Sequence, residues 1–400
     1  MMKQGSVFGG ALLVAGSCIG AGMLALPIVT GMSGFFCSTI LFFLAWGFMI
    51  STALLIVETN GWFHERISFL SLLDRIIGRS FKAVGWVTYL FLFYALLVAY
   101  ISGIGTLFTS FFTSFFHLQI PDWLGSVVLV VLFGWVVYLG TRSVDLCNRF
   151  LMAVKIIFFC LLVLSSMNYV NPWLLVHMDF TYAPKSFPLL IIAFGFQNMV
   201  PSLTHYMKGD LKRVRLSIVT GSLMAFLVYL IWELIVLGIL PLDQIRESLQ
   251  TGRDSSQALS LFLNLTQIKI WAGGLAFFAI LTSFFSQSLS LVHFFADGFK
   301  IVHKKHESLN LCLLAFCPPL LFALCYPQLF FKALNFAGGI CAVILYGVLP
   351  VIMVWIGRYH KVMKGTYRFP FGKFSLVLIF IVAVSILLLQ IADMLGSKIV

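Results

Sequence analysis

The chain has 400 residues, of which 61% are hydrophobic and only 10% are charged, far below the roughly 25% of ordinary soluble domains. This composition, with 42 Phe residues, excludes a water-soluble core and predicts an all-α integral membrane protein. The net charge of +12 could indicate a nucleic-acid partner, but the basic residues follow the expected membrane topology, so we expect the lipid bilayer and no nucleic acid.

Eleven apolar segments are long enough to cross a bilayer, which takes about 20 residues. We expect the first segment to be retained as a span, because it has no clear signal-peptide cleavage site. The predicted spans are 7–31, 35–59, 82–112, 123–140, 149–168, 187–206, 216–241, 270–297, 309–326, 333–356 and 374–395.

The distribution of Lys and Arg gives the orientation of these spans. With the N-terminus inside, the cytoplasmic segments carry about three times as many basic residues as the outer segments, as the positive-inside rule requires. We therefore predict a multi-pass protein of the cell inner membrane with a cytoplasmic N-terminus and a periplasmic C-terminus. The polar stretch Leu242–Lys269 is expected to form an external lid, with its apolar part lying along the outer surface.

The first span is interrupted by the glycine-rich run GSCIGAG, residues 16–22. Three glycines in seven residues weaken a helix near mid-membrane depth. A helix-packing GxxxG motif is the alternative explanation, and a dinucleotide-binding loop is excluded because no strand precedes the run. The candidate substrate-binding residues in this break are Ser17, Cys18, Gly20, Ala21 and Gly22.

The sixth span carries a matching interruption, followed within one turn by Pro201. Two breaks at corresponding positions favour a central binding site over simple helix packing, because unwound backbone in lipid needs a partner for its polar groups. The candidate substrate-binding residues here are Phe194, Gly195, Phe196, Gln197 and Asn198.

The two broken spans are the first spans of two consecutive five-span blocks, 7–168 and 187–356. Both blocks belong to a single transporter domain covering 1–400. An odd number of spans inverts the second block relative to the first, which leaves 374–395 as a peripheral eleventh helix. Half-helix N-termini suit a carboxylate and half-helix C-termini suit a cation. A zwitterionic amino acid satisfies both.

Several motifs resemble the hydroxy/aromatic amino acid permeases, in particular the bacterial tyrosine and tryptophan permeases. The resemblance covers nearly the whole chain and lies in GSVF from Gly5, AGSCIGAGMLALP from Ala15, Glu58, AFGFQ from Ala193 with PSL from Pro201, LTSF from Leu281 and ADG from Ala296. It implies eleven spans, a leucine-transporter-like 5+5 inverted repeat, and proton-driven uptake of tyrosine, tryptophan or phenylalanine, with tyrosine expected here.

Lys155 lies inside the fifth predicted span, where burying an ammonium costs at least about 2.5 kcal/mol. In related proton-coupled transporters a lysine of this span occupies the place of sodium, between spans 1 and 8. By resemblance, we hypothesise that Lys155 gains and loses the coupling proton. The alternative is a lysine that snorkels to the cytoplasmic surface.

Ala279, Thr282 and Ser283 share one face of the eighth span, a face that ligates sodium in sodium-coupled relatives. The alternative is that both hydroxyls bond their own helix carbonyls.

Glu233 in span 7 is a candidate for gating or proton relay, or for a structural hydrogen bond. Glu58, at the inner end of span 2, is a gating candidate or an interface residue. His293 and Asp297 are expected to hold the end of span 8, with a titrating His–carboxylate pair as the alternative.

Selectivity for the side chain of the substrate is expected from Tyr94, Tyr100 and Ser102 of span 3, together with Phe194 and Phe196.

We expect no cofactor, no metal, no catalytic residues and a functional monomer. Coupling to sodium, or another neutral amino acid as substrate, remains the alternative within the same fold. A membrane-embedded enzyme is disfavoured because no HExxH or GxSxG motif occurs, and a channel because no repeated filter-like loop occurs.

Overall fold

The computed structural model describes residues 5–63, 67–116, 118, 121–299, 309–326 and 330–396, and all regular secondary structure in these residues is helical. Six basic residues of the predicted topology lie outside them: Lys3, Arg66, Lys300, Lys304, Lys305 and Lys398.

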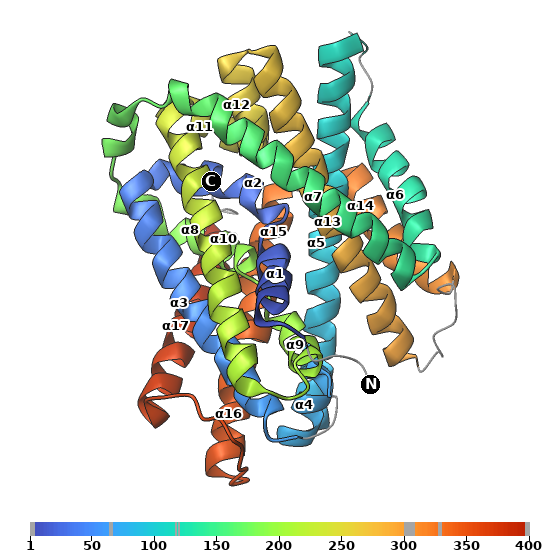
Figure 1. The fold of residues 1–400 in the computed structure, drawn as a ribbon, viewed down its shortest axis with the longest axis vertical. Helices are drawn as coiled ribbons and strands as arrows, with labels where there is room; N and C mark the ends of the chain where they lie inside the picture. The colour runs from blue at the N-terminus through green and yellow to red at the C-terminus, as the bar shows by residue number, and fades with distance from the viewer. Residues whose placement is uncertain are drawn as a thin grey trace.

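The elements of the first half match the first five predicted spans and their connections (Figure 1). They are α1 (Val7–Cys18), α2 (Gly22–Thr30), η1 (Gly31–Ser33), α3 (Phe35–Asn60), α4 (Phe69–Ile76), α5 (Arg79–Phe116), α6 (Asp122–Tyr138), α7 (Thr141–Ser166), η2 (Met167–Tyr169), η3 (Pro172–Val176) and η4 (Phe180–Tyr182).

The second half begins with another interrupted span. Its elements are α8 (Ala183–Ala193), η5 (Gln197–Met199), α9 (Val200–Tyr206), α10 (Leu211–Ile239), α11 (Leu242–Thr251), α12 (Ser255–Leu263), α13 (Thr266–Gly298), α14 (Leu309–Cys325), α15 (Phe330–Phe336), the π-helix η6 (Ala337–Val348), α16 (Leu349–Tyr359) and α17 (Gly372–Gly396).

The described part of the chain contains eight helical segments that are long and apolar enough to cross a membrane, or nine if α1 and α2 count as one bent span. Among the eight, Phe180–Tyr206 combines the elements from η4 to α9, and Phe330–Tyr359 those from α15 to α16. Helices α6 and α14 are also apolar but have only 17 residues each. They coincide with two further predicted spans, so the full number of eleven stays a prediction.

Two elements were not anticipated from the sequence. Helix α4 is amphipathic and buries Phe69, Leu72, Leu73 and Ile76, whose i, i+3, i+4, i+7 spacing is a recognisable signal. The π-helical turns of η6 lie within the tenth predicted span, where a Cβ on Gly338 would collide with the carbonyl of Pro188 in α8. This close approach requires glycine.

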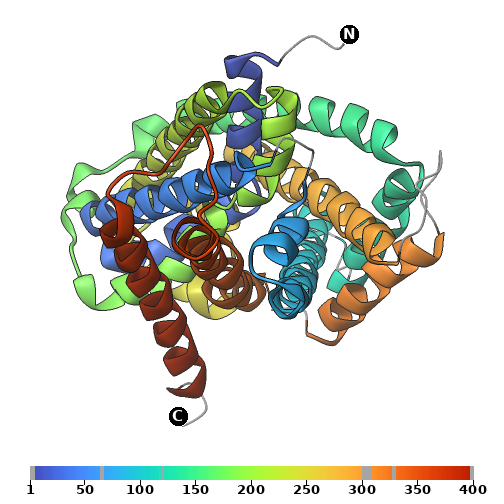
Figure 2. The ribbon, with the colours of Figure 1, turned by 90° about the horizontal axis from the view of Figure 1, so that it is seen from below.

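The described helices form one bundle, seen from one end in Figure 2, and their contacts distinguish two groups within it. In one group α1 packs mainly on α10, and α3 contacts α8, α9 and α10, while α2 contacts α8. In the other group α13 packs mainly on α7, and α5 contacts α6, α13 and α14. Both broken spans belong to the first group.

The stretch expected to form a lid folds as α11 and α12, at the end of the molecule opposite α4 and α16 (Figure 1). Helix α12 does more than lie on a surface. The Ser255 hydroxyl is fully buried, donates to the Leu24 carbonyl of α2 (2.6 Å) and accepts from Trp232 Nε1 of α10 (3.1 Å). The start of α12 is thereby wedged against the second half of the first broken span.

Candidate functional site

The first break lies between Cys18 and Gly22, where the axes of α1 and α2–η1 differ by 57°. The Ala21 amide inside the break donates to Ser283 Oγ of α13 (3.0 Å). A Cβ on Gly20 would collide with the same oxygen. The glycine therefore allows the unwound backbone to approach α13 closely.

The second break follows Ala193, and helix resumes at Val200 with Pro201 in its first turn, where a proline loses no helical hydrogen bond. Gln197 is fully buried and holds this break to α3. Its Oε1 accepts from the Phe196 amide (2.9 Å), and its Nε2 donates to the Met49 carbonyl (3.0 Å) and to Thr52 Oγ1 (3.1 Å). The Gln197 amide is thus engaged in packing within the first group of helices.

Tyr229 of α10 joins the two breaks, and the sequence analysis missed it. Its hydroxyl lies 2.5 Å from the Cys18 carbonyl and 2.8 Å from the Ala193 carbonyl, at the ends of α1 and α8. Its ring packs edge-on against Phe194 at 5.0 Å. A buried tyrosine needs a partner for its hydroxyl, so a Tyr one helical turn before Glu233 in an apolar span was the available signal.

Lys155 is 1% exposed, so the alternative interpretation, a lysine that snorkels to the surface, is wrong. Its Nζ donates to the Ile19 carbonyl in the first break (2.5 Å) and to Thr282 Oγ1 of α13 (3.2 Å). Ile19 caps the C-terminal end of α1, where the helix dipole is negative and favours a cation. The ammonium therefore connects span 1, span 5 and span 8.

The predicted face of span 8 lies beside this ammonium. The hydroxyls of Thr282 and Ser283 both donate to the Ala279 carbonyl, at 3.1 Å and 3.0 Å. With their lone pairs they accept from Lys155 Nζ and from the Ala21 amide, respectively. Both hydroxyls thus bond a carbonyl of their own helix, which was the alternative left open by the sequence, and Ser283 also contacts span 1.

Glu233 is fully buried, and its Oε1 lies 2.5 Å from Thr30 Oγ1 at the end of α2. It is separated from the Lys155 contacts by the length of α2, so the structure does not bring these two candidates together.

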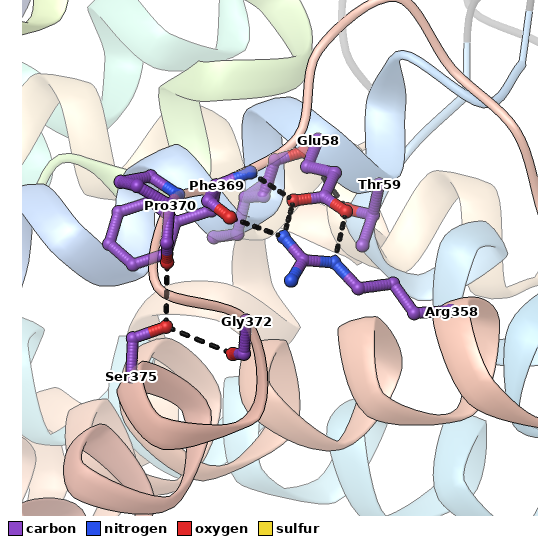
Figure 3. A network of polar contacts seen from close by, with 8 residues as sticks. Glu58, Thr59, Arg358, Phe369, Pro370, Gly372 and Ser375 are labelled. Atoms are coloured by element: carbon purple, nitrogen blue, oxygen red, sulfur yellow. Dashed lines mark hydrogen bonds and ion pairs between the residues drawn. The ribbon is translucent and has the colours of Figure 1, made fainter.

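Glu58 is not the water-accessible interface residue that one interpretation of the sequence allowed, because it is 1% exposed. It forms a bidentate ion pair with Arg358 of α16 and accepts from the Phe369 amide at 2.7 Å (Figure 3). Its position at the C-terminal end of α3 agrees with the prediction, but its partner was not anticipated.

The specificity candidates separate into two sets. Tyr100 is buried against Ser283, close to the first break, and Phe194 and Phe196 are fully buried at the second. Tyr94 instead donates to the Leu314 carbonyl of α14 (2.9 Å), which places it at a contact between α5 and α14.

The remaining predicted residues have simple placements. Ser102 is 2% exposed, Ser17 is half-buried in the last turn of α1, and Gly195 lies in the second break. Asn198 is half-buried, and its Oδ1 has no hydrogen-bond partner within the described chain. His293, near the end of α13, lies with Nε2 3.4 Å from Thr141 Oγ1.

Comparison with known proteins connects this geometry to a family. Residues 3–390 match the family described as tryptophan/tyrosine permeases. The chain belongs to this permease family. Among its relatives, tyrosine-specific transport system 1 of Haemophilus influenzae (strain ATCC 51907 / DSM 11121 / KW20 / Rd) is 31% identical over 386 residues, 94% of each chain. Membership of a permease family decides between a transporter and a membrane enzyme in favour of the transporter.

Two further relatives of this permease come from the same organism. Tyrosine-specific transport system 2 is 29% identical and covers 97% of both chains, and a tryptophan-specific transport protein is 28% identical and covers 98% and 97%. The permease also resembles the crystal structure of MhsT in complex with L-phenylalanine, with a TM-score of 0.67 over 98% of this chain and 99% of that one, at 14% identity. This likeness shows a shared leucine-transporter-like fold.

Proposed function

We propose that the protein is a secondary transporter that imports an aromatic amino acid, tyrosine first, across the inner membrane by proton symport. The family and its tyrosine- and tryptophan-specific members support the aromatic substrate class. The observation that carries the coupling mechanism is the buried ammonium of Lys155 between the first break and span 8.

The two breaks support recognition of the amino acid backbone. Carbonyls at the ends of α1 and α8 are suited to the substrate ammonium, and the amide-rich starts of α2 and α9 are suited to its carboxylate. The aromatic side chain would then lie among Tyr100, Phe194 and Phe196. Ring-on-ring contacts of this kind favour aromatic substrates.

The proton would act through Lys155. A charged ammonium binds the Ile19 carbonyl and Thr282 and thereby draws span 1 toward span 8. When the amine loses its proton it becomes a weaker partner for these oxygens, so the first break is released from span 8. Alternating access would follow as the group of α1, α2, α3, α8, α9 and α10 rocks against the group of α5, α6, α7, α13 and α14.

The division of the helices into these two groups supports a 5+5 inverted repeat, 7–168 and 187–356, with α17 as a peripheral eleventh helix. Each repeat opens with a broken span, and the described helices of both repeats contribute to both groups. We propose that the monomer is the functional unit and that the N-terminus is cytoplasmic.

Uptake of labelled tyrosine into proteoliposomes tests this function directly. An inward proton gradient should drive uptake, and unlabelled tyrosine, tryptophan and phenylalanine should compete. Uptake driven by a sodium gradient and not by protons would overturn the coupling but leave the substrate class. No uptake of any aromatic amino acid under either gradient would overturn the substrate class as well.

Replacement of Lys155 by Met tests the coupling residue. We expect proton-driven uptake to fall by about tenfold or more, since the methionine keeps the apolar length but cannot carry charge to the first break. Lys212→Met, at an exposed position in the first turn of α10, is the matched control and should transport normally. Unchanged proton-driven uptake by Lys155→Met would exclude the role of Lys155.

A further inference from the structure

Glu233 is an acidic side chain without a cation. It lies on α10 and is fully buried, and it contacts the hydroxyl of Thr30, the last residue of α2. Within the described chain its other oxygen, Oε2, has no hydrogen-bond partner, and no Lys, Arg or His forms an ion pair with it. By contrast, Glu58, the other buried glutamate of the described membrane helices, has both oxygens paired with Arg358.

The hydroxyls around Glu233 already have acceptors for their protons. Thr30 Oγ1 lies 2.7 Å from the Leu26 carbonyl, one turn earlier in α2. Ser38 Oγ of α3, which also faces the carboxyl, lies 2.8 Å from the Gly34 carbonyl and 3.1 Å from the Thr30 carbonyl. A hydroxyl has one proton, so each of these groups can donate to a carbonyl and accept from Glu233. A carboxyl can donate only when it is protonated.

The free-energy cost of burying a charge also favours the protonated, neutral form of Glu233. Removing a carboxylate from water without a cation costs far more than burying a neutral carboxylic acid, which needs only one acceptor for its proton. Thr30 Oγ1 lies 2.5 Å from Oε1 and can be that acceptor when its own proton is donated to the Leu26 carbonyl.

The ionisable groups of the neighbouring helices do not compensate a charge on Glu233. Helices α1, α2, α3, α7, α9 and α12 and the short turns η2 and η3 pack against α10. The ionisable residues of these elements are Cys18, Cys37, Glu58, Arg142, Asp145, Cys147, Arg149, Lys155, Cys160, Tyr169, His205, Tyr206 and the α12 cap Asp254, while α2 and η3 offer none. In the described structure Lys155 binds Ile19 and Thr282, Glu58 binds Arg358, and Asp254 caps α12. None of these groups is hydrogen-bonded or ion-paired to Glu233 in the described residues.

We propose that Glu233 is a second proton-binding site, separate from Lys155, whose bound proton holds α2 against α10. The protonated carboxyl donates to Thr30 and closes the seam between the second half of span 1 and span 7. Loss of this proton leaves a buried carboxylate facing oxygen atoms, and α2 then separates from α10 so that water can reach the charge. The proposal deepens the proton symport proposed above and rests on it for a role in transport, but the proton itself can be detected without transport.

Infrared spectroscopy of the purified full-length protein tests whether the proton is present. At neutral pH the wild type should show a C=O stretching band of a protonated carboxylic acid that is absent from Glu233→Gln. The amide of Gln can donate to Thr30 as the acid does, so this variant is expected to fold. Glu247→Gln is the matched control. Glu247 lies on α11, is exposed and pairs with Arg253, so it should contribute no such band. A wild type without any protonated-carboxyl band, or a band that Glu233→Gln retains, would overturn the proposal.

Hydrogen–deuterium exchange tests the link to α2. After correction for the intrinsic pH dependence of exchange, peptides covering Gly22–Ser33 should lose protection in the wild type at the alkaline pH where the carboxyl band disappears. Glu233→Gln, which cannot ionise, should keep that protection over the same range. Equal behaviour of both proteins would refute the proton-held contact. Neither measurement depends on substrate, so a failed uptake assay with a positive infrared result would overturn the proposed function alone.

Discussion

Breaking the ion pair between Glu58 and Arg358 should cost this protein more stability than any surface charge change. Arg358 Nε donates to Oε1 at 2.6 Å and Nη2 to Oε2 at 2.5 Å, and the two side chains are only 4% and 2% exposed. Nη2 also donates to the Phe369 carbonyl (2.9 Å), so the pair fixes the loop before α17 to α3 and α16 (Figure 3).

The magnitude follows from what each replacement leaves behind. Glu58→Gln keeps an acceptor for the Phe369 amide but leaves a buried, unpaired guanidinium, which costs about 3–5 kcal/mol. Arg358→Met leaves an unpaired carboxylate and should cost a similar amount. The double variant has no buried charge, so its loss should be smaller than the sum of the two by about 2 kcal/mol or more.

Unfolding in detergent micelles, followed over a denaturant series, measures these differences. The exposed pair Glu247–Arg253 provides the control, because its side chains are 48% and 39% exposed and Glu247→Gln should change stability by no more than about 1 kcal/mol. Single variants that each lose less than about 1 kcal/mol, or a double variant whose loss equals the sum, would refute the argument that burial makes this pair indispensable.

Three further substitutions test a buried hydroxyl, a close helix contact and a buried carboxyl. Tyr229→Phe leaves carbonyls at both breaks without their hydroxyl and should destabilise the fold by about 1–3 kcal/mol in the same unfolding assay; wild-type stability would contradict the bridge. Gly274→Ala puts a methyl group into the ring of Phe158 and should cost about 1–3 kcal/mol, whereas Gly273→Ala, with open space around it, should stabilise α13 by up to about 1 kcal/mol. The reverse order would be inconsistent with the α7–α13 contact. Burial raises the pKa of Asp254 above its ordinary value of 3.8, so the folded chain holds this proton more tightly than the unfolded chain. The free energy of unfolding should therefore fall as the pH rises from the ordinary pKa of the carboxyl through its higher pKa in the folded chain. Asp254→Asn keeps the helix cap and should abolish this fall in thermal unfolding at a series of pH values; an unchanged slope would assign it to another group.

The predicted spans and both breaks agree well with the structure because their signals are local. Apolar length sets where a helix can cross lipid, and clustered glycines or a proline determine where it opens. The same reasoning missed α4, which is too short for a hydropathy criterion, and the π-helical turns of η6, which have no local sequence signal comparable to a glycine run.

The individual site residues were harder to predict. Lys155 stood out because a charge in an apolar run needs compensation, and its contact with the first break was expected by resemblance. Gln197 was predicted to bind the substrate, and in the described structure its side-chain amide bonds α3, since an amide in a break can satisfy polar groups on either side. The choice depends on which neighbouring helix offers a free carbonyl.

The sequence by itself determined that this chain is a membrane protein, where its helices open and that a charge is buried in the fifth span, because these follow from the composition and order of adjacent residues. The position of that charge beside the first break was expected only from the family resemblance. Only the tertiary structure decided the partners: Glu58 with Arg358, 300 positions apart, and Tyr229 with two helix ends, 211 and 36 positions away. Pairings of this kind depend on how helices rotate and pack against one another. No local pattern encodes that rotation when nearly every face of every helix is apolar.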